Sequence, residues 1–177
     1  MTQDDVAIDT YLGAILFTDL VGFTEFTDGV GDVAALAVLE TQRSIVEAVI
    51  EGVSGARVVK ELGDGLMVWF SSAVDGLACA GRMMRMIDGQ RAEGSFPLAV
   101  RMGMHFGSAL ARGDDLVGQS VNVAARVSDL AGPGELLVSD ELVGEYSGDS
   151  VGFEMHSVGP VRVRGVHAPI WLHRLTF

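Results

Sequence analysis

Two aspartates, Asp19 and Asp64, are the first residues whose placement in the sequence indicates chemistry. Asp19 closes a run of apolar and β-branched residues, Leu12 to Phe17, that predicts a buried strand. Asp64 stands in a glycine-rich loop between two strand-like segments. Carboxylates that converge repel each other unless a cation lies between them. Aspartates with phosphate oxygens are common ligands of magnesium, and a pair of such ions about 3.5 to 4 Å apart assists in-line displacement at phosphorus.

The elements that must position these aspartates are expected in the order strand, helix, hairpin, helix, strand. After the first strand and a glycine-rich turn, a long amphipathic helix is expected, with Asp32 as its N-cap and Gly55 as its end. The next elements are a hairpin, a helix and a strand, at residues 57–60 with 66–70, 72–91 and 98–105. In ferredoxin-like domains, which have this order, the first and third strands are central neighbours. The topology would therefore bring Asp19 and Asp64 to one edge of the sheet.

The expected fold class is α+β: a ferredoxin-like βαββαβ core, with an antiparallel sheet and helices on one face, followed by extra C-terminal strands and a short helix. The later segments are a strand at 107–112, a loop at 113–115, a helix at 120–130, a strand at 136–138, a short helix capped by Ser139, and strands at 161–166 and 170–175. No linker divides the chain, so we expect an N-terminal extension, residues 1–12, and a single domain, residues 13–177.

The composition narrows the classes of function. With 177 residues, 49% of them apolar and 20% charged, the chain is expected to form an ordered domain. A net charge of -12 without a basic cluster disfavours nucleic acid and anionic membranes as partners, and a phosphate ligand would need divalent cations or a local basic pocket. We expect no signal peptide and no membrane insertion, because no basic leader and no apolar stretch of roughly 18 residues occurs. The single cysteine, Cys79, fits a cytoplasmic location.

Several segments, taken in order, carry a family resemblance. They are Phe-Thr-Asp-Leu-Val-Gly-Phe-Thr at 17–24, Lys-Glu-Leu-Gly-Asp-Gly-Leu-Met at 60–67, and Asp-Leu-Val-Gly-Gln-Ser-Val-Asn-Val-Ala-Ala-Arg at 115–126, with further matches at 101–107 and 134–139. These segments resemble the motifs of class III nucleotidyl cyclases, the adenylyl and guanylyl cyclase family. The resemblance covers about residues 13 to 175, which is nearly the whole chain.

The resemblance implies how a nucleotide would be read. Asp19 and Asp64 fall on the positions that bind two divalent metal ions, Mg²⁺ or Mn²⁺, and Lys60 and Asp115 on the pair that reads the purine. Adenine presents an acceptor at N1 and a donor at its amine, which an ammonium and a carboxylate complement, whereas guanine reverses both edges. Guanylyl members typically carry other residues at these positions. The implied substrate is therefore ATP rather than GTP.

The same resemblance assigns the remaining site residues. Asn122 and Arg126 fall on the pair that holds the ribose and stabilises the transition state, and their four-residue spacing puts both on one helix face. The loop after the first strand could offer backbone N–H groups to phosphate oxygens at a helix start, through Gly22, Phe23 and Thr24.

The implied reaction is attack of the ribose 3′-hydroxyl of ATP on the α-phosphorus, which gives 3′,5′-cyclic AMP and pyrophosphate. In this family the metal-binding and purine-binding residues of one site come from different chains arranged head to tail. Because this chain carries both sets, the resemblance implies a homodimer with two shared sites.

The sequence predicts the roles of two arginines and one histidine less definitely. Arg164 stands where family members often have a basic residue that contacts the triphosphate, but it alternates with Arg162 on an expected strand, where both would be solvated. Arg112 is a weaker candidate for the same contact. His105 lies in a matched segment and is read as a structural residue.

Other classes of function fit these residues less well. A diguanylate cyclase would show a GGDEF-like hairpin, which Gly63-Asp64-Gly65 lacks. A catalytically inactive homologue, acting as a nucleotide-binding or regulatory module, usually lacks one of the metal, purine or ribose residues, and all are present here. A guanylyl cyclase is a further alternative. A P-loop is absent, because the only lysine, Lys60, follows Val59.

Overall fold

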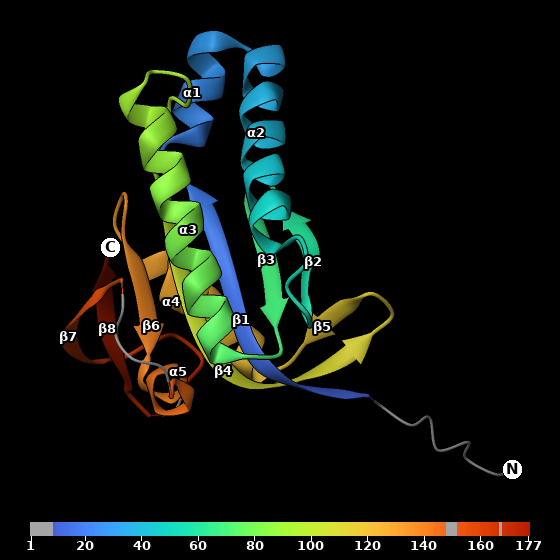
Figure 1. The fold of residues 1–177 in the computed structure, drawn as a ribbon, viewed down its shortest axis with the longest axis vertical. Helices are drawn as coiled ribbons and strands as arrows, with labels where there is room; N and C mark the ends of the chain where they lie inside the picture. Colours follow the sequence, from blue (N-terminus) through green and yellow to red (C-terminus); the bar gives the residue numbers. More distant parts are fainter. Residues whose placement is uncertain (1–8, 148–151, 167) are drawn as a thin grey trace, which may run out of the picture.

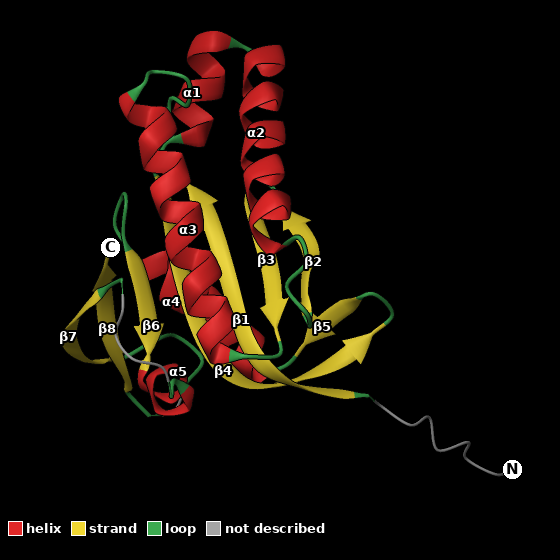
Figure 2. Cartoon of the chain, viewed as in Figure 1, coloured by secondary structure: helices red, strands yellow, loops and turns green. Residues whose placement is uncertain are grey.

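The computed structural model describes residues 9–147, 152–166 and 168–177, which form one mixed sheet with helices packed on it (Figures 1 and 2). The strands are β1 (Thr10–Leu20), β2 (Ala56–Leu62), β3 (Gly65–Phe70), β4 (Val100–Arg112), β5 (Asp115–Val117), β6 (Leu136–Ser139), β7 (Glu154–Val161) and β8 (Ile170–Thr176). The helices are α1 (Phe23–Val30), α2 (Asp32–Ile50), α3 (Ala73–Ala92), α4 (Gln119–Leu130) and α5 (Asp140–Glu145).

The strand order confirms the predicted fold class. It runs β2-β3-β1-β4-β6-β8-β7, with β5 paired to β4. The first four of these strands form the ferredoxin-like core, in which β1 is antiparallel to both β3 and β4. The β4–β6 pair is parallel, and β6, β8 and β7 extend the sheet beyond the core. The first and third strands are therefore central neighbours, as the sequence predicted.

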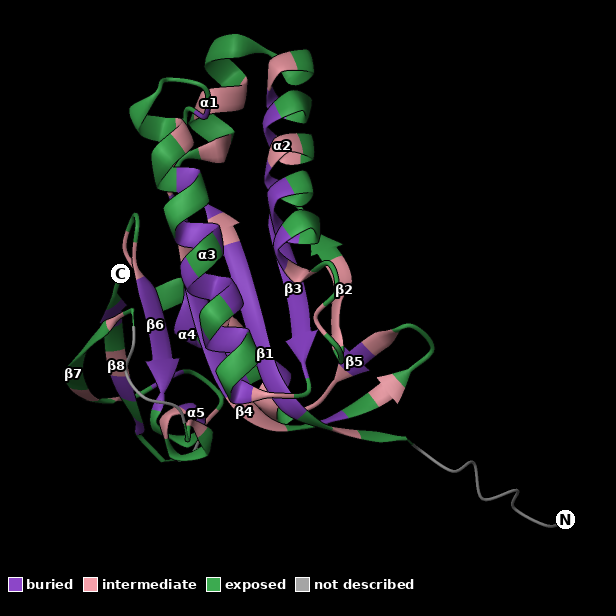
Figure 3. Cartoon of the chain, in the orientation of Figure 1, coloured by how far each residue is buried: buried purple, intermediate pink, exposed green. Residues whose placement is uncertain are grey.

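The two faces of β1 are buried against different helices. Ala14 and Leu16 belong to the large core under α2 and α3, whereas Ile15 and Phe17 pack with residues of α4 on the other face. Figure 1 shows α2 and α3 in front of the sheet and α4 behind it. Figure 3 shows the resulting burial along β1 and β3, and every residue of β3 is buried. This alternation decides which face each site residue occupies.

The helical boundaries differ from the expectation near the first strand. Residues 23–30 form the helix α1, not a glycine-rich turn, and Gly22 precedes it with a φ of +78°. Asp32 is the first residue of α2 and not its N-cap, which is Gly31, and α2 ends at Ile50 rather than near Gly55. No capping side chain marks the start of α1, and Gly29 lies within it. A helix of two turns that has no capping side chain and contains a glycine is difficult to predict from sequence.

The strand boundaries differ in three places. The segments expected at 98–105 and 107–112 form one continuous strand, β4, because Gly107 continues the extended backbone. Asp115, expected in a loop, begins β5. The strand expected at 161–166 lies earlier, at β7, and Val163 instead fills a buried position against α4.

The other predicted elements agree with the structure. The hairpin expected from strands at 57–60 and 66–70 forms as β2 and β3, and α4, β6 and β8 lie where the sequence placed them. The Ser72 hydroxyl caps α3 by accepting from the Asp75 amide, and Ser139 caps α5 by accepting from the Leu142 amide. β1 begins at Thr10, inside the expected extension, whose residues 1–8 lie outside the described part of the chain. Among the described residues, no helix is both long and apolar enough to cross a bilayer.

Candidate active site

Asp19 lies near the end of β1, on the face of the sheet that α4 covers. Its neighbour Phe17 packs on this face, while the Thr18 hydroxyl points to the other face, where it accepts from the Gln42 amide of α2 at 3.1 Å. A pocket of about 290 Å³ opens beside Asp19, and Asn122 and Arg126 of α4 also line it. The structure therefore brings the candidate metal ligand of β1 and the candidate ribose pair of α4 to one pocket.

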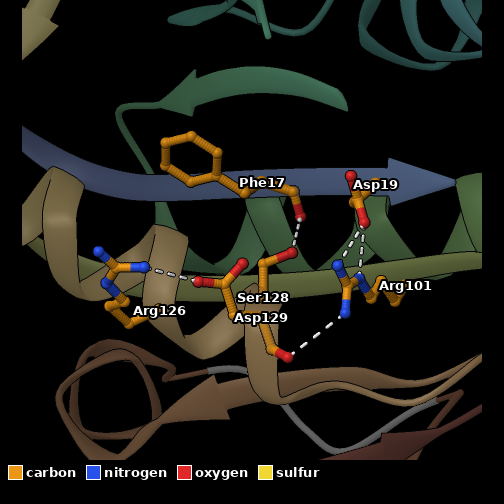
Figure 4. A network of polar contacts seen from close by, with 6 residues as sticks. All are labelled: Phe17, Asp19, Arg101, Arg126, Ser128 and Asp129. Carbon is orange, nitrogen blue, oxygen red and sulfur yellow. Dashed lines mark hydrogen bonds and ion pairs between the residues drawn. The ribbon is translucent and has the colours of Figure 1, made fainter. Parts of the chain in front are cut away.

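Arg101 is the cation that pairs with Asp19. The two residues are directly opposite each other in the β1–β4 register. The Arg101 Nε donates to Asp19 Oδ2 at 2.7 Å and its Nη2 lies 2.6 Å from the same oxygen (Figure 4). Both side chains are about one third exposed, at 31% and 29%. Charge-assisted contacts of this length through two nitrogens are among the stronger hydrogen bonds in proteins.

Asp64 lies in the turn between β2 and β3, where the negative charge of Asp19 affects its ionisation. Burial and then the negative charge of Asp19 raise the pKa of Asp64, against smaller lowering effects from backbone N–H groups and Arg101. Two half-buried carboxylates thus share one arginine, and this excess of negative charge suits a divalent cation. The described residues contain no group of three or more metal-ligating side chains, so waters or phosphate oxygens would have to complete the coordination.

Lys60 and Asp115 form a separate ion pair. The Lys60 Nζ donates to Asp115 Oδ2 at 2.8 Å, and Asp115 Oδ1 accepts from the Leu116 amide at 2.7 Å. The hydrogen bond from Lys60 lowers the pKa of Asp115, to which Arg112 also contributes. Since Arg112 is paired with Asp115 across β4 and β5, it belongs to this end of the site. The structure thus joins two residues that the sequence paired only through family resemblance.

Helix α4 carries its polar site residues on its exposed face. Asn122 and Arg126 are both exposed, and the Arg126 Nη1 donates to Asp129 Oδ2 at 3.0 Å (Figure 4). The C-terminal end of α4 lies directly on β4, because a Cβ on Gly103 would stand 2.0 Å from the Ser128 nitrogen. Ser128 donates to the Phe17 carbonyl at 3.4 Å, which joins the helix to β1. A side chain at position 103 would push α4 away from the pocket.

The remaining predicted residues lie near the site or at its margin. Gly22 and Phe23 form the junction between β1 and α1, so the helix start follows Asp19 closely in the chain. Arg164 is exposed in a turn between β7 and β8, beside Val163, which packs against α4. Asp64 lines a second pocket, of about 310 Å³, against α2. Lys60, Asp115 and Arg164 line neither of these two pockets.

Sequence reasoning missed two residues of this network, Arg101 and Asp129. Arg101 pairs with Asp19, and its Nη1 also reaches the backbone carbonyl of Asp129 at 3.4 Å. Arg101 stands within a matched segment, but only the β1–β4 register shows that it faces Asp19. Asp129 follows Arg126 by three residues, a spacing at which helical side chains meet.

Comparison with known proteins shows which family this chain resembles. The family model of the adenylate and guanylate cyclase catalytic domain matches residues 11–175. A pH-sensitive adenylate cyclase of Mycobacterium tuberculosis is 31% identical over 91% of this chain, and a protein of Rhizobium meliloti is 29% identical over 90% of it. The chain spans only 40% and 27% of the lengths of these two curated relatives.

Solved structures show the same fold. The adenylyl cyclase CyaB from P. aeruginosa superimposes with a TM-score of 0.83 over 97% of both chains, at 22% identity. An adenylate/guanylate cyclase/hydrolase from Silicibacter pomeroyi gives a TM-score of 0.78 at 26% identity, over 96% of this chain and 98% of that one. With the match to the family model over nearly its whole length, this chain belongs to the class III adenylate and guanylate cyclase catalytic domains.

Proposed function

We propose that residues 13–177 form a catalytic domain that converts ATP to 3′,5′-cyclic AMP and pyrophosphate. The observation that carries this proposal is the Lys60–Asp115 pair at 2.8 Å, together with the unbalanced pair of carboxylates at Asp19 and Asp64. The Lys60–Asp115 pair offers a hydrogen-bond donor and an acceptor to a purine base. The carboxylates of Asp19 and Asp64 offer negative charge to a metal cation. Because the substrate would be ATP, we place the domain in the cytoplasm.

The preference for ATP rests on Lys60 and Asp115. Their side chains remain 30% and 36% exposed, so they are available to a base edge. The ammonium would donate to adenine N1, and the carboxylate would accept from the exocyclic amine. Guanine would leave both groups unmatched, at about 1 to 3 kcal/mol for each buried mismatch. The family includes cyclases of both kinds, so its fold does not decide between ATP and GTP.

Different residues of this chain would carry out different parts of the reaction at the α-phosphorus. Asp19 and Asp64 would hold the divalent cations, Mg²⁺ or Mn²⁺. Bound there, such ions would lower the pKa of the ribose 3′-hydroxyl and bind the triphosphate. Asn122 would hydrogen-bond the ribose, and the Arg126 guanidinium would meet the charge that develops on the α-phosphate oxygens.

Only a weak surface ion pair holds Arg126 away from that role. Its ion pair with Asp129 at 3.0 Å is exposed, at 50% and 54%, and such surface pairs contribute only about 0 to 1 kcal/mol. A phosphate oxygen would therefore displace Asp129 at little cost. The backbone N–H groups at Gly22, Phe23 and Thr24 would bind the triphosphate at the start of α1, with Arg164 as a further phosphate contact.

We propose that each active site combines two chains of a homodimer. In one chain, Asp19 lines a pocket that Lys60 and Asp115 do not line, which is the pattern expected if the purine residues serve the partner's metal ligands. The test mixes a Lys60→Ala chain with an Asp19→Ala chain, each strongly impaired by itself. Heterodimers should regain activity, because one of their two sites carries no substitution. Inactive heterodimers would contradict shared sites.

The decisive experiment is a product assay with ATP and GTP in turn, each with Mg²⁺ and with Mn²⁺. Cyclic AMP should form and cyclic GTP should form far more slowly. A dimeric protein that binds ATP but makes no cyclic nucleotide under any of these conditions would instead be a nucleotide-binding regulatory module. Faster formation of cyclic GTP would make it a guanylyl cyclase.

A further inference from the structure

The contact between Arg101 and Asp19 holds one of the two proposed metal ligands. Two nitrogens of Arg101 converge on a single carboxylate oxygen, Asp19 Oδ2, at 2.6 and 2.7 Å. The third nitrogen, Nη1, lies 3.4 Å from the Asp129 carbonyl. Figure 4 shows the guanidinium between the end of β1 and the end of α4, bound on both sides. The arginine is therefore anchored, and Asp19 is not a free carboxylate.

The charges around this contact show why it forms. The negative charge of Asp19 acts on Asp64, so the two carboxylates repel each other. Lys60 is engaged by Asp115 and Arg126 by Asp129, each through an ion pair of its own. Among these site cations, Arg101 is the one that balances the Asp19–Asp64 pair. Without it, two half-buried carboxylates would face each other unscreened.

A divalent cation would have to compete with this arginine. It would bind the same carboxylate, and a guanidinium and a metal ion on one carboxylate repel each other. Arg101 has a second acceptor ready in the Asp129 carbonyl, toward which its Nη1 already points. The arginine can therefore leave Asp19 while remaining partly satisfied.

We propose that Arg101 is a built-in counter-ion that occupies the carboxylate pair of the metal-free chain and must leave Asp19 before a metal ion binds there. This inference rests on the proposed function, since it takes Asp19 as a metal ligand. Its consequence is that metal binds weakly to the nucleotide-free protein. An anionic substrate supplies the charge that allows both cations to remain in the site.

The test is direct binding of Mn²⁺ to the nucleotide-free protein, measured from the electron paramagnetic resonance signal of free Mn²⁺. Arg101→Met keeps the length of the side chain and removes its charge. Because a neighbouring opposite charge changes the proton affinity of a carboxylate about tenfold or more, we expect Arg101→Met to bind Mn²⁺ about tenfold more tightly than the unmodified chain. Arg91→Met is the matched control, since Arg91 pairs with Asp88 at the surface of α3, and it should stay within about twofold.

Each further outcome separates this inference from the proposed function. Adding Asp19→Asn to Arg101→Met should abolish the gain in Mn²⁺ affinity. If Arg101→Met, with an unchanged circular dichroism spectrum, binds Mn²⁺ no more tightly than the unmodified chain, the counter-ion inference is wrong and the metal site still stands. If the gain survives Asp19→Asn, Asp19 is not a metal ligand, and the metal assignment of the proposed function fails as well.

Discussion

The two ends of the candidate site use the same side chain, aspartate, in opposite electrostatic settings. At one end Asp115 has its own cation, Lys60, at 2.8 Å, and the hydrogen bond from that lysine lowers its pKa. At the other end Asp19 and Asp64 share Arg101, and burial with the charge of Asp19 raises the pKa of Asp64. The first end is balanced and the second carries surplus negative charge.

Exposure of the paired side chains does not explain this difference. Asp19 and Arg101 are 29% and 31% exposed, close to the 36% and 30% of Asp115 and Lys60. What differs is the number of carboxylates for each cation, with the partial burial of Asp64 added. A balanced pair suits hydrogen bonds to a neutral base, and an unbalanced one suits a metal ion. The following predictions test this contrast, from the largest expected effect to the smallest.

Removing the surplus charge should abolish activity without unfolding the protein. Asp64→Asn should lower kcat by about 100- to 1,000-fold, because metal-ion catalysis contributes several kcal/mol and about 1.4 kcal/mol corresponds to a factor of ten. The measurement is cyclic AMP formation at saturating ATP and Mn²⁺. Asp88→Asn, on the surface of α3, is the control and should keep full activity. Near-normal turnover by Asp64→Asn would mean that Asp64 takes no part in catalysis.

Breaking the balanced pair should change specificity more than chemistry. Lys60→Met should lower kcat/KM for ATP by about 10- to 100-fold and leave that for GTP nearly unchanged, because only adenine loses a matched partner. Both values come from initial rates over a range of nucleotide concentrations. Arg57→Met, in the same strand, is a matched control, since Arg57 donates to the Asp114 carbonyl rather than to Asp115. An equal loss with both nucleotides would mean that Lys60 does not read the base.

Neutralising each carboxylate should change stability in opposite directions at pH 7. The raised pKa of Asp64 means that its ionised form opposes folding above that pKa, so Asp64→Asn should raise the Tm at pH 7 and have no such effect below about pH 3.8. The lowered pKa of Asp115 means that its ionised form favours folding above about pH 3.8, and this contribution is lost as the pH falls through the folded pKa.

Asp115→Asn should therefore lower the Tm at pH 7, by a few degrees at most, because so exposed an ion pair contributes about 0 to 1 kcal/mol. Thermal melts of both variants at pH 7 and pH 3 measure the two effects. Changes of the same sign at pH 7 would mean that the two ends do not differ as described.

A buried histidine away from both ends, His105, should contribute a smaller loss of stability at acid pH. This loss must be separated from the effects of Asp64 and Asp115. His105 lines a pocket together with residues of α4. Its Nδ1 lies 2.7 Å from Ser139 Oγ, and Glu141 of α5 approaches it at 3.7 Å. Burial lowers the pKa of His105, with Glu141 opposing, so its contribution to stability is lost as the pH falls below about 6.5 through the folded pKa. His105→Gln should lose less Tm between pH 7 and pH 5 than the unmodified chain, as measured by calorimetry. An identical loss would assign the acid effect elsewhere.

Much of the candidate site could be predicted from the sequence because its residues lie in short contiguous motifs. Lys60 and Asp64 share one hairpin, Asn122 and Arg126 share one helix face, and Asp19 ends a strand whose apolar run is unambiguous. These features depend on local periodicity, which a sequence displays directly. The helix α1 escaped prediction because its short run has no capping side chain and includes a glycine.

The sequence by itself determined the order of the core elements, the fold class and the positions of the candidate ligands along the chain. Only the tertiary structure decided which charges meet. Arg101 faces Asp19 because of the β1–β4 register, and Asp129 reaches Arg101 because Gly103 lets α4 lie against β4. The pairing of Lys60 with Asp115 likewise depends on where β5 folds back on β4. The physical reason is that periodicity is set by near neighbours in the chain, whereas the partner of a charge is set by distant segments that packing brings together.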